Sequence, residues 1–206
     1  FIHDMKEKWG ITVDQQNASE DADEAASQDK SQDAVVFEVG HMSATVGLMT
    51  YPVPNGEAEA NAENNYMWPE AVKAAREHCA HILVAVLGKE EDVLEKGKLY
   101  TKLVAACCRQ KHATGVYTSG VVFEPRFYES AAHVLDEGEL PIFNWIWFGL
   151  YRSEGGLSAY TYGMDAFGKD EMEVLDVNAR FDELRDFLTV LVFYVLDYFH
   201  LTNDQA

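Results

Sequence analysis

The sequence predicts an α+β fold, with a ferredoxin-like α/β sandwich in the first half and an antiparallel sheet with a long C-terminal helix in the second half. Two observations predict it. Segments with helical and strand-like spacing alternate as far as about residue 110, whereas strand-like runs between residues 142 and 175 precede a long amphipathic helix. The chain has 206 residues, 48% of them hydrophobic, which is enough for a sizeable core. We therefore treat residues 1–206 as a single domain.

The chain opens with a short predicted helix. Phe1, Met5 and Trp9 recur at the spacing of one helical face, and Gly10 ends the helix. Residues 11–13 (ITV) predict a short strand. Residues 14–34 are an acidic, low-complexity insert that lacks large apolar side chains. Such a segment cannot bury enough surface to offset the entropy cost of ordering it, so we expect an exposed loop or a short solvated helix.

A β-hairpin and a buried strand are predicted next. Residues 35–39 and 42–51 read as two strands joined by a turn at Gly40 and His41. Pro69 begins a predicted helix that runs to about Ala80, with Val72, Ala75 and Cys79 on its inner face. Six apolar residues in succession, 82–87, fit a central strand that is buried on both faces. Helices are then expected at 91–110 and 125–135, and short strands at 115–118 and 121–123.

The second half is dominated by one strand rich in aromatic residues. Residues 142–151 (IFNWIWFGLY) predict a strand on which Phe143, Trp145, Trp147 and Tyr151 share one face. A strand that is apolar on both faces either lies in the core or covers a partner or a second copy of the chain. Residues 157–162 and 171–175 predict its antiparallel neighbours. Leucines and other apolar residues at helical spacing predict the last helix over 181–200, with Asn178 as its candidate N-cap.

Several short motifs occur in an order that resembles a bacterial family known as domain of unknown function 4261. These are PVP at 52–54, WPEA at 68–71, HILV at 81–84, LYTKLV at 99–104, GVY at 115–117, YTYGM at 160–164, FGK at 167–169, EME at 171–173 and YVL at 194–196. The resemblance covers roughly residues 35–200 and excludes the acidic insert. It implies a bacterial origin, but no agreed activity and no catalytic residues. The chain departs from the pattern at 201–206, where LTNDQA replaces an expected Gly-Asp-Thr type of ending.

Charge and cysteine content narrow the possible functions. Asp and Glu number 35 against 16 Lys and Arg, which gives a formal net charge of −19. This balance argues against a nucleic-acid-binding protein, because phosphate groups are neutralised by excess Lys and Arg. The net negative charge would also be repelled by an anionic membrane. No targeting segment is visible, and the longest apolar stretch, 188–196, is too short to span a bilayer. Cys79, Cys107 and Cys108 form no disulfide framework, so we expect a cytoplasmic protein.

Residues 163–170 (GMDAFGKD) nearly spell the P-loop pattern that binds phosphate groups. Asp170, however, replaces the Ser or Thr that would hold Mg²⁺, and a strand follows where a helix N-terminus would be needed. We therefore expect a glycine-rich turn between two strands and no cofactor. His78 and His81 flank Cys79 but lack the further donors of a zinc site, so we expect structural imidazoles and no metal.

The strongest polar cluster in the sequence contains Thr161, Tyr162, Lys169, Glu171 and Glu173. On a strand, Glu171 and Glu173 would point to the same side, and paired carboxylates can perform acid–base or metal chemistry. A solvated strand face explains the same pattern without any chemistry. Because no Gly-x-Ser-x-Gly elbow occurs, nothing identifies a serine hydrolase, and we assign no catalytic residue.

Three functional hypotheses follow. The leading one is a non-catalytic acidic interaction module, of adaptor or immunity type. We expect it to bind a basic protein and to bind neither nucleic acid nor a membrane. Its ligand or partner surface would be formed by Trp68 and Trp145 together with the polar cluster of Thr161, Tyr162, Lys169, Glu171 and Glu173. The alternative is a metal-assisted hydrolytic enzyme that uses Glu171, Glu173, His78 and His81. The third is a small-ligand binder that uses Trp68 and Trp145. A homodimer is compatible with each hypothesis.

Overall fold

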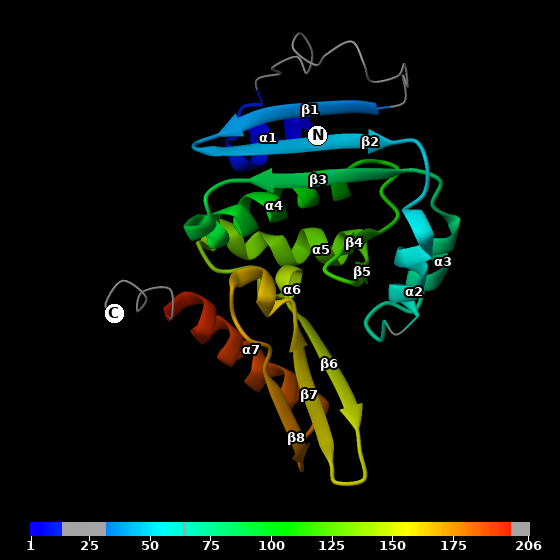
Figure 1. Ribbon diagram of the computed structural model, residues 1–206, viewed down its shortest axis with the longest axis vertical. Coiled ribbons are helices and arrows are strands. Elements are labelled where there is room, and N and C mark those ends of the chain that lie inside the picture. Colours follow the sequence, from blue (N-terminus) through cyan, green and yellow to red (C-terminus); the bar gives the residue numbers. More distant parts are fainter. Residues whose placement is uncertain (14–31, 64, 199–206) are drawn as a thin grey trace. The chain divides into compact units, whose positions relative to one another are not determined.

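The computed structural model describes residues 1–13, 32–63 and 65–198 (Figure 1). The fold is α+β, as the sequence predicts, and it includes the long C-terminal helix. The sequence predicts a single domain, but the chain divides into two compact units, Phe1–Ala132 and His133–Ala206. The two units are described in turn.

In its described residues, 1–13, 32–63 and 65–132, the first unit contains two small antiparallel sheets and five α-helices. Its elements are α1 (Ile2–Trp9), β1 (Gln32–Val39), β2 (Met42–Met49), η1 (Pro54–Gly56), α2 (Glu57–Ala62), α3 (Ala71–Glu77), β3 (His81–Leu87), η2 (Glu90–Asp92), α4 (Val93–Cys108), β4 (Val116–Thr118), β5 (Val121–Phe123) and α5 (Pro125–Ala132). The strands form a three-stranded sheet in the order β1-β2-β3 and a separate β4-β5 pair. The ferredoxin-like arrangement that we expected in this half stays a prediction.

The predicted hairpin is confirmed, with Phe37 opposite Ala44. Strand β1 begins at Gln32, so the last residues of the expected acidic loop belong to a strand; the remainder, 14–31, lies outside the described residues. The predicted strand at 11–13 is wrong. Gly10 adopts the left-handed conformation, and the backbone N–H of Ile11 donates to the Met5 carbonyl, so these residues complete the helix end and then enter the core.

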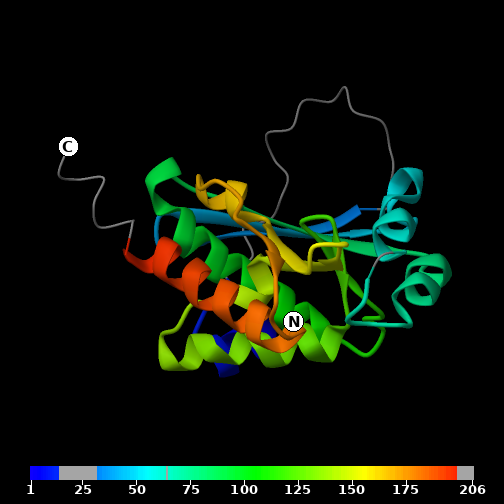
Figure 2. The same ribbon diagram turned by 90° about the horizontal axis from the view of Figure 1, so that it is seen from below.

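One face of the β1-β2-β3 sheet is covered by helices. Phe37 and Ala44 are buried together with Met5 of α1 and with Leu99 and Leu103 of α4. Figure 2 shows α4 running alongside the three strands. Because side chains alternate along a strand, these contacts define an inner face, and the residues between them define an outer face.

Strand β3 differs most from its prediction. We expected a central strand buried on both faces, but β3 pairs only with β2 and lies at the edge of the sheet. Val84 and Val86 pack on the inner face, whereas Leu83 (46% exposed) and Leu87 (68% exposed) lie on the outer face. An uninterrupted apolar run shows that a strand could be buried on both sides, but it does not show that another element covers both sides.

A second apolar cluster forms beside the sheet. Ala58 and Ala62 of α2 pack with Ala71 and Ala75 of α3, and Trp68 covers them. The helix predicted to reach Ala80 ends at Glu77, because His78 is already extended. Cys79, expected on the inner face, is exposed as a result.

The second unit is an antiparallel sheet packed against one long helix. Its elements are η3 (His133–Glu137), α6 (Ile142–Trp145), β6 (Trp147–Arg152), β7 (Leu157–Tyr162), η4 (Met164–Phe167), β8 (Glu173–Val177) and α7 (Phe181–Tyr198), and the strand order is β6-β7-β8. The single strand predicted over 142–151 is wrong in its first half. Residues Ile142–Trp145 form a helical turn after Pro141, closed by a bond from the Ile146 N–H to the Ile142 carbonyl, so Phe143 and Trp145 are not strand residues.

Helix α7 buries one narrow stripe. Leu184, Leu188, Val192 and Leu196 recur every four residues and are buried, and the helix contacts β6 and β7. The helix begins at Phe181, three residues after Asn178, so Asn178 is not the N-cap that the sequence predicts. The backbone N–H of Arg180 donates to the Glu183 carboxylate, so the Glu183 side chain serves this helix start.

Candidate functional site

The turn between β7 and β8 contains the P-loop-like residues. Gly163 and Gly168 both have positive φ and enclose the short helix η4. The Glu171 carboxylate accepts hydrogen bonds from the backbone N–H groups of Gly163 (2.7 Å) and Met164 (2.9 Å). The N–H groups that a phosphate would need are thus satisfied by the chain's own carboxylate. The prediction of a glycine-rich turn between two strands is confirmed.

Glu171 and Glu173 do not act as a pair. Strand β8 begins only at Glu173, so the predicted strand over 171–175 starts two residues too early. The Thr161 hydroxyl donates to Glu171 (2.7 Å) and accepts from the Met172 N–H, which ties Glu171 to the turn. Glu173 instead accepts from the Tyr151 hydroxyl (3.1 Å). Each carboxylate thus has its own, separate partners.

Four aromatic residues share the face of the β6-β7-β8 sheet opposite to its buried side chains. Register places Trp147 opposite Tyr162 and Gly149 opposite Tyr160, and alternation puts Tyr151 on the same side. We call Trp147, Tyr151, Tyr160, Tyr162 and Glu173 the tyrosine face. Tyr151 and Tyr160 are each 40% exposed and Tyr162 is 49% exposed. Phe148, Leu157 and Ala159, on the other face, are buried.

Gly149 gives the tyrosine face its shape. A Cβ atom at this position would lie 2.1 Å from the Tyr160 ring, which shows that the ring lies flat over the glycine backbone of the neighbouring strand. The Tyr151 and Tyr160 ring centroids are 6.3 Å apart. Any larger residue at 149 would lift the Tyr160 ring from the sheet. The glycine therefore holds two aromatic rings side by side at the surface.

Carboxylates lie next to these rings. The Ser158 hydroxyl bonds Tyr151 and favours its ionised form, but desolvation and the charges of Glu173 and Asp176 outweigh this effect, so the pKa of Tyr151 is raised. Asp176 also bonds the Ser153 hydroxyl, and its backbone N–H donates to Ser158. Within the tyrosine face, the Tyr151 phenol thus lies close to negatively charged side chains.

The two tryptophans proposed as partner residues have packing roles. Trp145 is buried and lies 4.7 Å from the Phe167 ring, centroid to centroid, so it belongs to the core of the second unit and not to an exposed surface. Trp68 covers the alanine cluster and stands beside Gly115. Lys169 follows the η4 turn, and its backbone N–H donates to the Met164 carbonyl.

The candidate metal ligands in the first unit are held by the backbone. His78 Nε2 accepts from the Val53 N–H (2.8 Å), and its Nδ1 bonds the Ala75 carbonyl, so both ring nitrogens are engaged. His81 Nδ1 donates to the Tyr51 carbonyl. Across residues 1–13, 32–63 and 65–198, no three His, Cys, Asp or Glu side chains gather in a way that could hold a metal ion.

The two helical cysteines are poor nucleophiles. Burial raises the pKa of Cys107 to about 11. Burial is also the main reason that the pKa of Cys108 is raised to about 12, and the nearby Cys107, Glu129 and Glu124 raise it further. Both thiols are therefore protonated near neutral pH.

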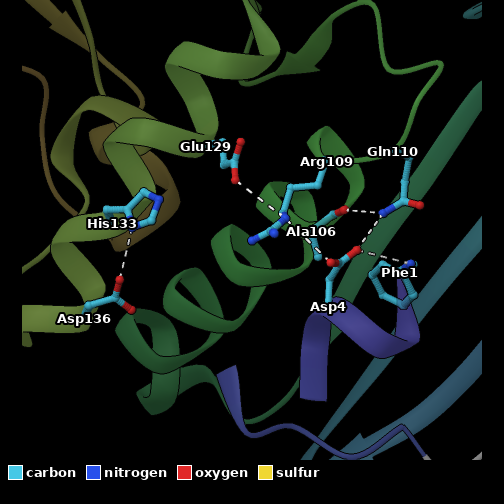
Figure 3. Close-up of polar contacts among 8 residues, drawn as sticks. All are labelled: Phe1, Asp4, Ala106, Arg109, Gln110, Glu129, His133 and Asp136. Atoms are coloured by element: carbon cyan, nitrogen blue, oxygen red, sulfur yellow. Dashed lines mark hydrogen bonds and ion pairs between the residues drawn. The ribbon is translucent and has the colours of Figure 1, made fainter. Parts of the chain in front are cut away.

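A polar cluster joins three helices of the first unit (Figure 3). Asp4 of α1 accepts from Gln110 (3.0 Å) and lies 3.6 Å from Arg109, which in turn lies 3.7 Å from Glu129 of α5. The Gln110 hydrogen bond is the largest influence on Asp4 and lowers its pKa. These contacts tie the end of α4 to α1 and α5, which is a structural role. Figure 3 also draws the separate pair His133–Asp136 of the second unit (3.1 Å).

Sequence reasoning therefore found part of the tyrosine face. It placed Trp147 and Tyr151 on one side of a strand and singled out Tyr162 and Glu173, but it missed Tyr160. The available signal was the Tyr-x-Tyr alternation in β7, together with a glycine in the middle of β6. No family model, curated protein or solved structure matches this chain.

None of the helices in the described ranges is long and apolar enough to cross a membrane.

Proposed function

We propose that this chain is a non-catalytic, acidic interaction module that binds a basic protein partner through the tyrosine face. The observation that carries the proposal is the exposure of several aromatic side chains beside the Glu173 carboxylate on one sheet face, with the Asp176 charge close enough to act on Tyr151. Aromatic residues are enriched at protein interfaces, because they offer large contact area and a polar end.

The chemistry of this face suits Lys and Arg side chains. An ammonium or guanidinium group is attracted to the face of a tyrosine ring, and a carboxylate beside the ring adds a charge-assisted hydrogen bond. The net charge of −19 would attract a basic partner over a longer range. An adaptor or immunity-type protein acts in this way, by covering a basic surface of its partner.

Two of the four groups that favoured a metal-assisted hydrolase, His78 and Glu171, are occupied in structural contacts. His78 is bonded through both ring nitrogens, and Glu171 satisfies two backbone N–H groups. A catalytic group has to be available to substrate, whereas these groups already hold the chain in place. This favours the interaction module over the enzyme.

The resemblance to the bacterial domain of unknown function 4261 family and the cytoplasmic location belong to the same proposal. The three free cysteines, of which Cys79 is exposed, support a reducing compartment.

The proposal is tested by titrating the protein with a fluorescein-labelled oligo-arginine peptide. We expect binding that weakens between about 50 mM and about 500 mM NaCl, as screening predicts. Replacing Tyr162 by alanine removes one cation–π contact and should weaken binding about 3- to 10-fold. Amide chemical-shift changes should concentrate in residues 147–162 and 173–177.

Two matched variants separate the tyrosine face from general charge attraction. Tyr194→Ala removes a similarly exposed tyrosine from α7 and is the control for Tyr162→Ala. Glu173→Gln removes the carboxylate of the tyrosine face, and Glu139→Gln, its control, removes the same charge elsewhere in the unit. We expect both controls to bind like the original protein. Equal weakening by the controls and by the tyrosine-face variants, or shifts spread evenly over acidic residues, would refute a specific surface.

A further inference from the structure

We propose that the free edge of strand β3 is a self-association site, at which a second copy of this chain pairs antiparallel with β3 and joins two three-stranded sheets into one. Within the described residues, β3 hydrogen-bonds to β2 on one side only. The opposite edge offers a row of backbone N–H and C=O groups, which is a template for another strand.

This edge lacks the features that usually prevent such pairing. Natural edge strands are short, or carry lysine, proline or a bulge that hinders a second strand. Strand β3 (HILVAVL) spans seven residues with neither proline nor a charged Lys, Arg, Asp or Glu side chain, and its register with β2 is continuous. Ile82, Leu83 and Leu87 are substantially exposed.

The charge distribution favours a second copy as the occupant. Two molecules of net charge −19 repel one another over most contacts, and an uncharged strand is a place where two identical surfaces meet without opposing carboxylates. A basic partner would gain nothing from carboxylates here, because the strand has none. An apolar strand that is its own complement is therefore the best fit.

The pairing is self-complementary in register. A two-fold axis beside Val84 would place Leu83 opposite Ala85 of the second copy on the outer face, and Ile82 opposite Val86 on the inner face. Leu83 and its counterpart would then cover each other diagonally across the new strand pair. Each contact between two different residues occurs twice, and each contact between a residue and its own counterpart occurs once on the axis, as a closed dimer requires.

The contact is small. Seven strand residues per copy compare with about 20–30 residues on each side of a standard interface, so we expect a weak dimer that depends on concentration. Dimerisation should become stronger as the salt concentration rises, whereas binding of the basic partner should become weaker. Raising NaCl from about 50 mM to about 500 mM screens the repulsion between the copies and should increase the dimer fraction.

Sedimentation equilibrium over a concentration series tests the proposal on the full chain. Leu83→Lys introduces neighbouring like charges in the dimer and should lower the association constant at least about 10-fold. Leu87→Lys, at an even more exposed position, is the second variant and should have the same effect if Leu83→Lys disturbs folding. Leu175→Lys makes the same change at an exposed position of β8 in the other unit and should leave the dimer intact.

Cys79 provides a geometric test without introducing a new residue. It is exposed, whereas the raised pKa values of Cys107 and Cys108 slow their labelling. A spin label at Cys79 lies five positions before Val84, so antiparallel pairing separates the two labels by about 30–35 Å along the strands. A distance in this range that disappears in Leu83→Lys supports the proposal.

A chain that stays monomeric at every salt and protein concentration would overturn this proposal. A dimer that Leu83→Lys and Leu87→Lys leave intact, or one with a clearly different label separation, would also overturn it. Peptide binding by the tyrosine face is independent of these outcomes. Leu83→Lys should bind oligo-arginine normally, and Glu173→Gln should dimerise normally.

Discussion

Single residues that look catalytic in the sequence can be structural in the folded chain, and Glu171 is the clearest case. Its carboxylate satisfies the N–H groups of Gly163 and Met164 and accepts from Thr161. A carboxylate that closes a glycine-rich turn in this way prevents an external anion from using the same donors. One side chain thus explains both why the turn is stable and why it should not bind phosphate.

Replacing Glu171 by alanine should lower the free energy of unfolding by about 1–2 kcal/mol, because charge-assisted hydrogen bonds to two backbone groups and a hydroxyl are lost. Urea denaturation measures this change. Glu173→Ala removes one hydrogen bond to an exposed tyrosine, so it should cost about 0.5 kcal/mol or less. Similar losses from the two variants would contradict the structural role assigned to Glu171.

At the scale of elements, the packing of α4 against α5 encloses several weakly acidic groups. The pKa of Tyr128 is raised well above its ordinary value, mainly by burial, and burial also raises the pKa of Tyr100. Cys107 and Cys108 shift in the same direction from their ordinary value of 9.0. All four groups favour the neutral form in the folded chain.

This helix pair should therefore lose stability at alkaline pH. The unfolded chain releases its thiol protons near pH 9, while the folded chain keeps them up to about 11 for Cys107 and about 12 for Cys108. The folded state binds more protons in that window, so the contribution of these groups to stability is fully present below about pH 9 and is lost as the pH rises through the folded-state pKa values. Urea midpoints measured at pH 8 and at about pH 10.5 should differ accordingly.

The variant Cys107→Ala/Cys108→Ala provides the control for this pH effect. Removing both thiols should make the alkaline loss of stability smaller, and the remaining loss would come from the tyrosines. Midpoints that do not change between the two pH values in the original chain would show that these groups ionise equally in the folded and unfolded states.

At the scale of the whole molecule, the dominant property is the net charge of −19. Like charges held in a compact chain repel one another, and dissolved salt screens them. This repulsion opposes both folding and self-association. The same negative charge attracts a basic partner. The same charge thus sets the sign of three different salt dependences.

We expect the melting temperature to rise by a few degrees between about 20 mM and about 500 mM NaCl, because screening relieves repulsion in the folded state. Differential scanning fluorimetry at low protein concentration measures it while the β3 dimer is dissociated. Sucrose at matched osmolality is the control for general solvent effects. A melting temperature that falls with salt would mean that attractive ion pairs, such as Arg109 with Asp4 and Glu129, outweigh the repulsion.

Local patterns in the sequence determined much of this protein. The α+β class, the hairpin of β1 and β2, the turn at 163–170 and the last helix follow from periodicity and turn residues, which act over a few neighbouring positions. The same local signals placed Trp147 and Tyr151 on one side of a strand. Their physical basis is the alternation of side chains along an extended chain, which needs no tertiary contact.

Only the tertiary structure decided which apolar surfaces were covered. Strand β3 and the segment Ile142–Trp145 are both rich in apolar residues, yet one is an exposed edge and the other a helical turn. The role of Glu171 was likewise decided by its partners in space. Strand-like alternation does not show that its carboxylate reaches the Gly163 and Met164 N–H groups and the Thr161 hydroxyl. Burial and hydrogen bonding are properties of neighbours in space, and the strand order that supplies those neighbours is fixed only when the whole chain packs.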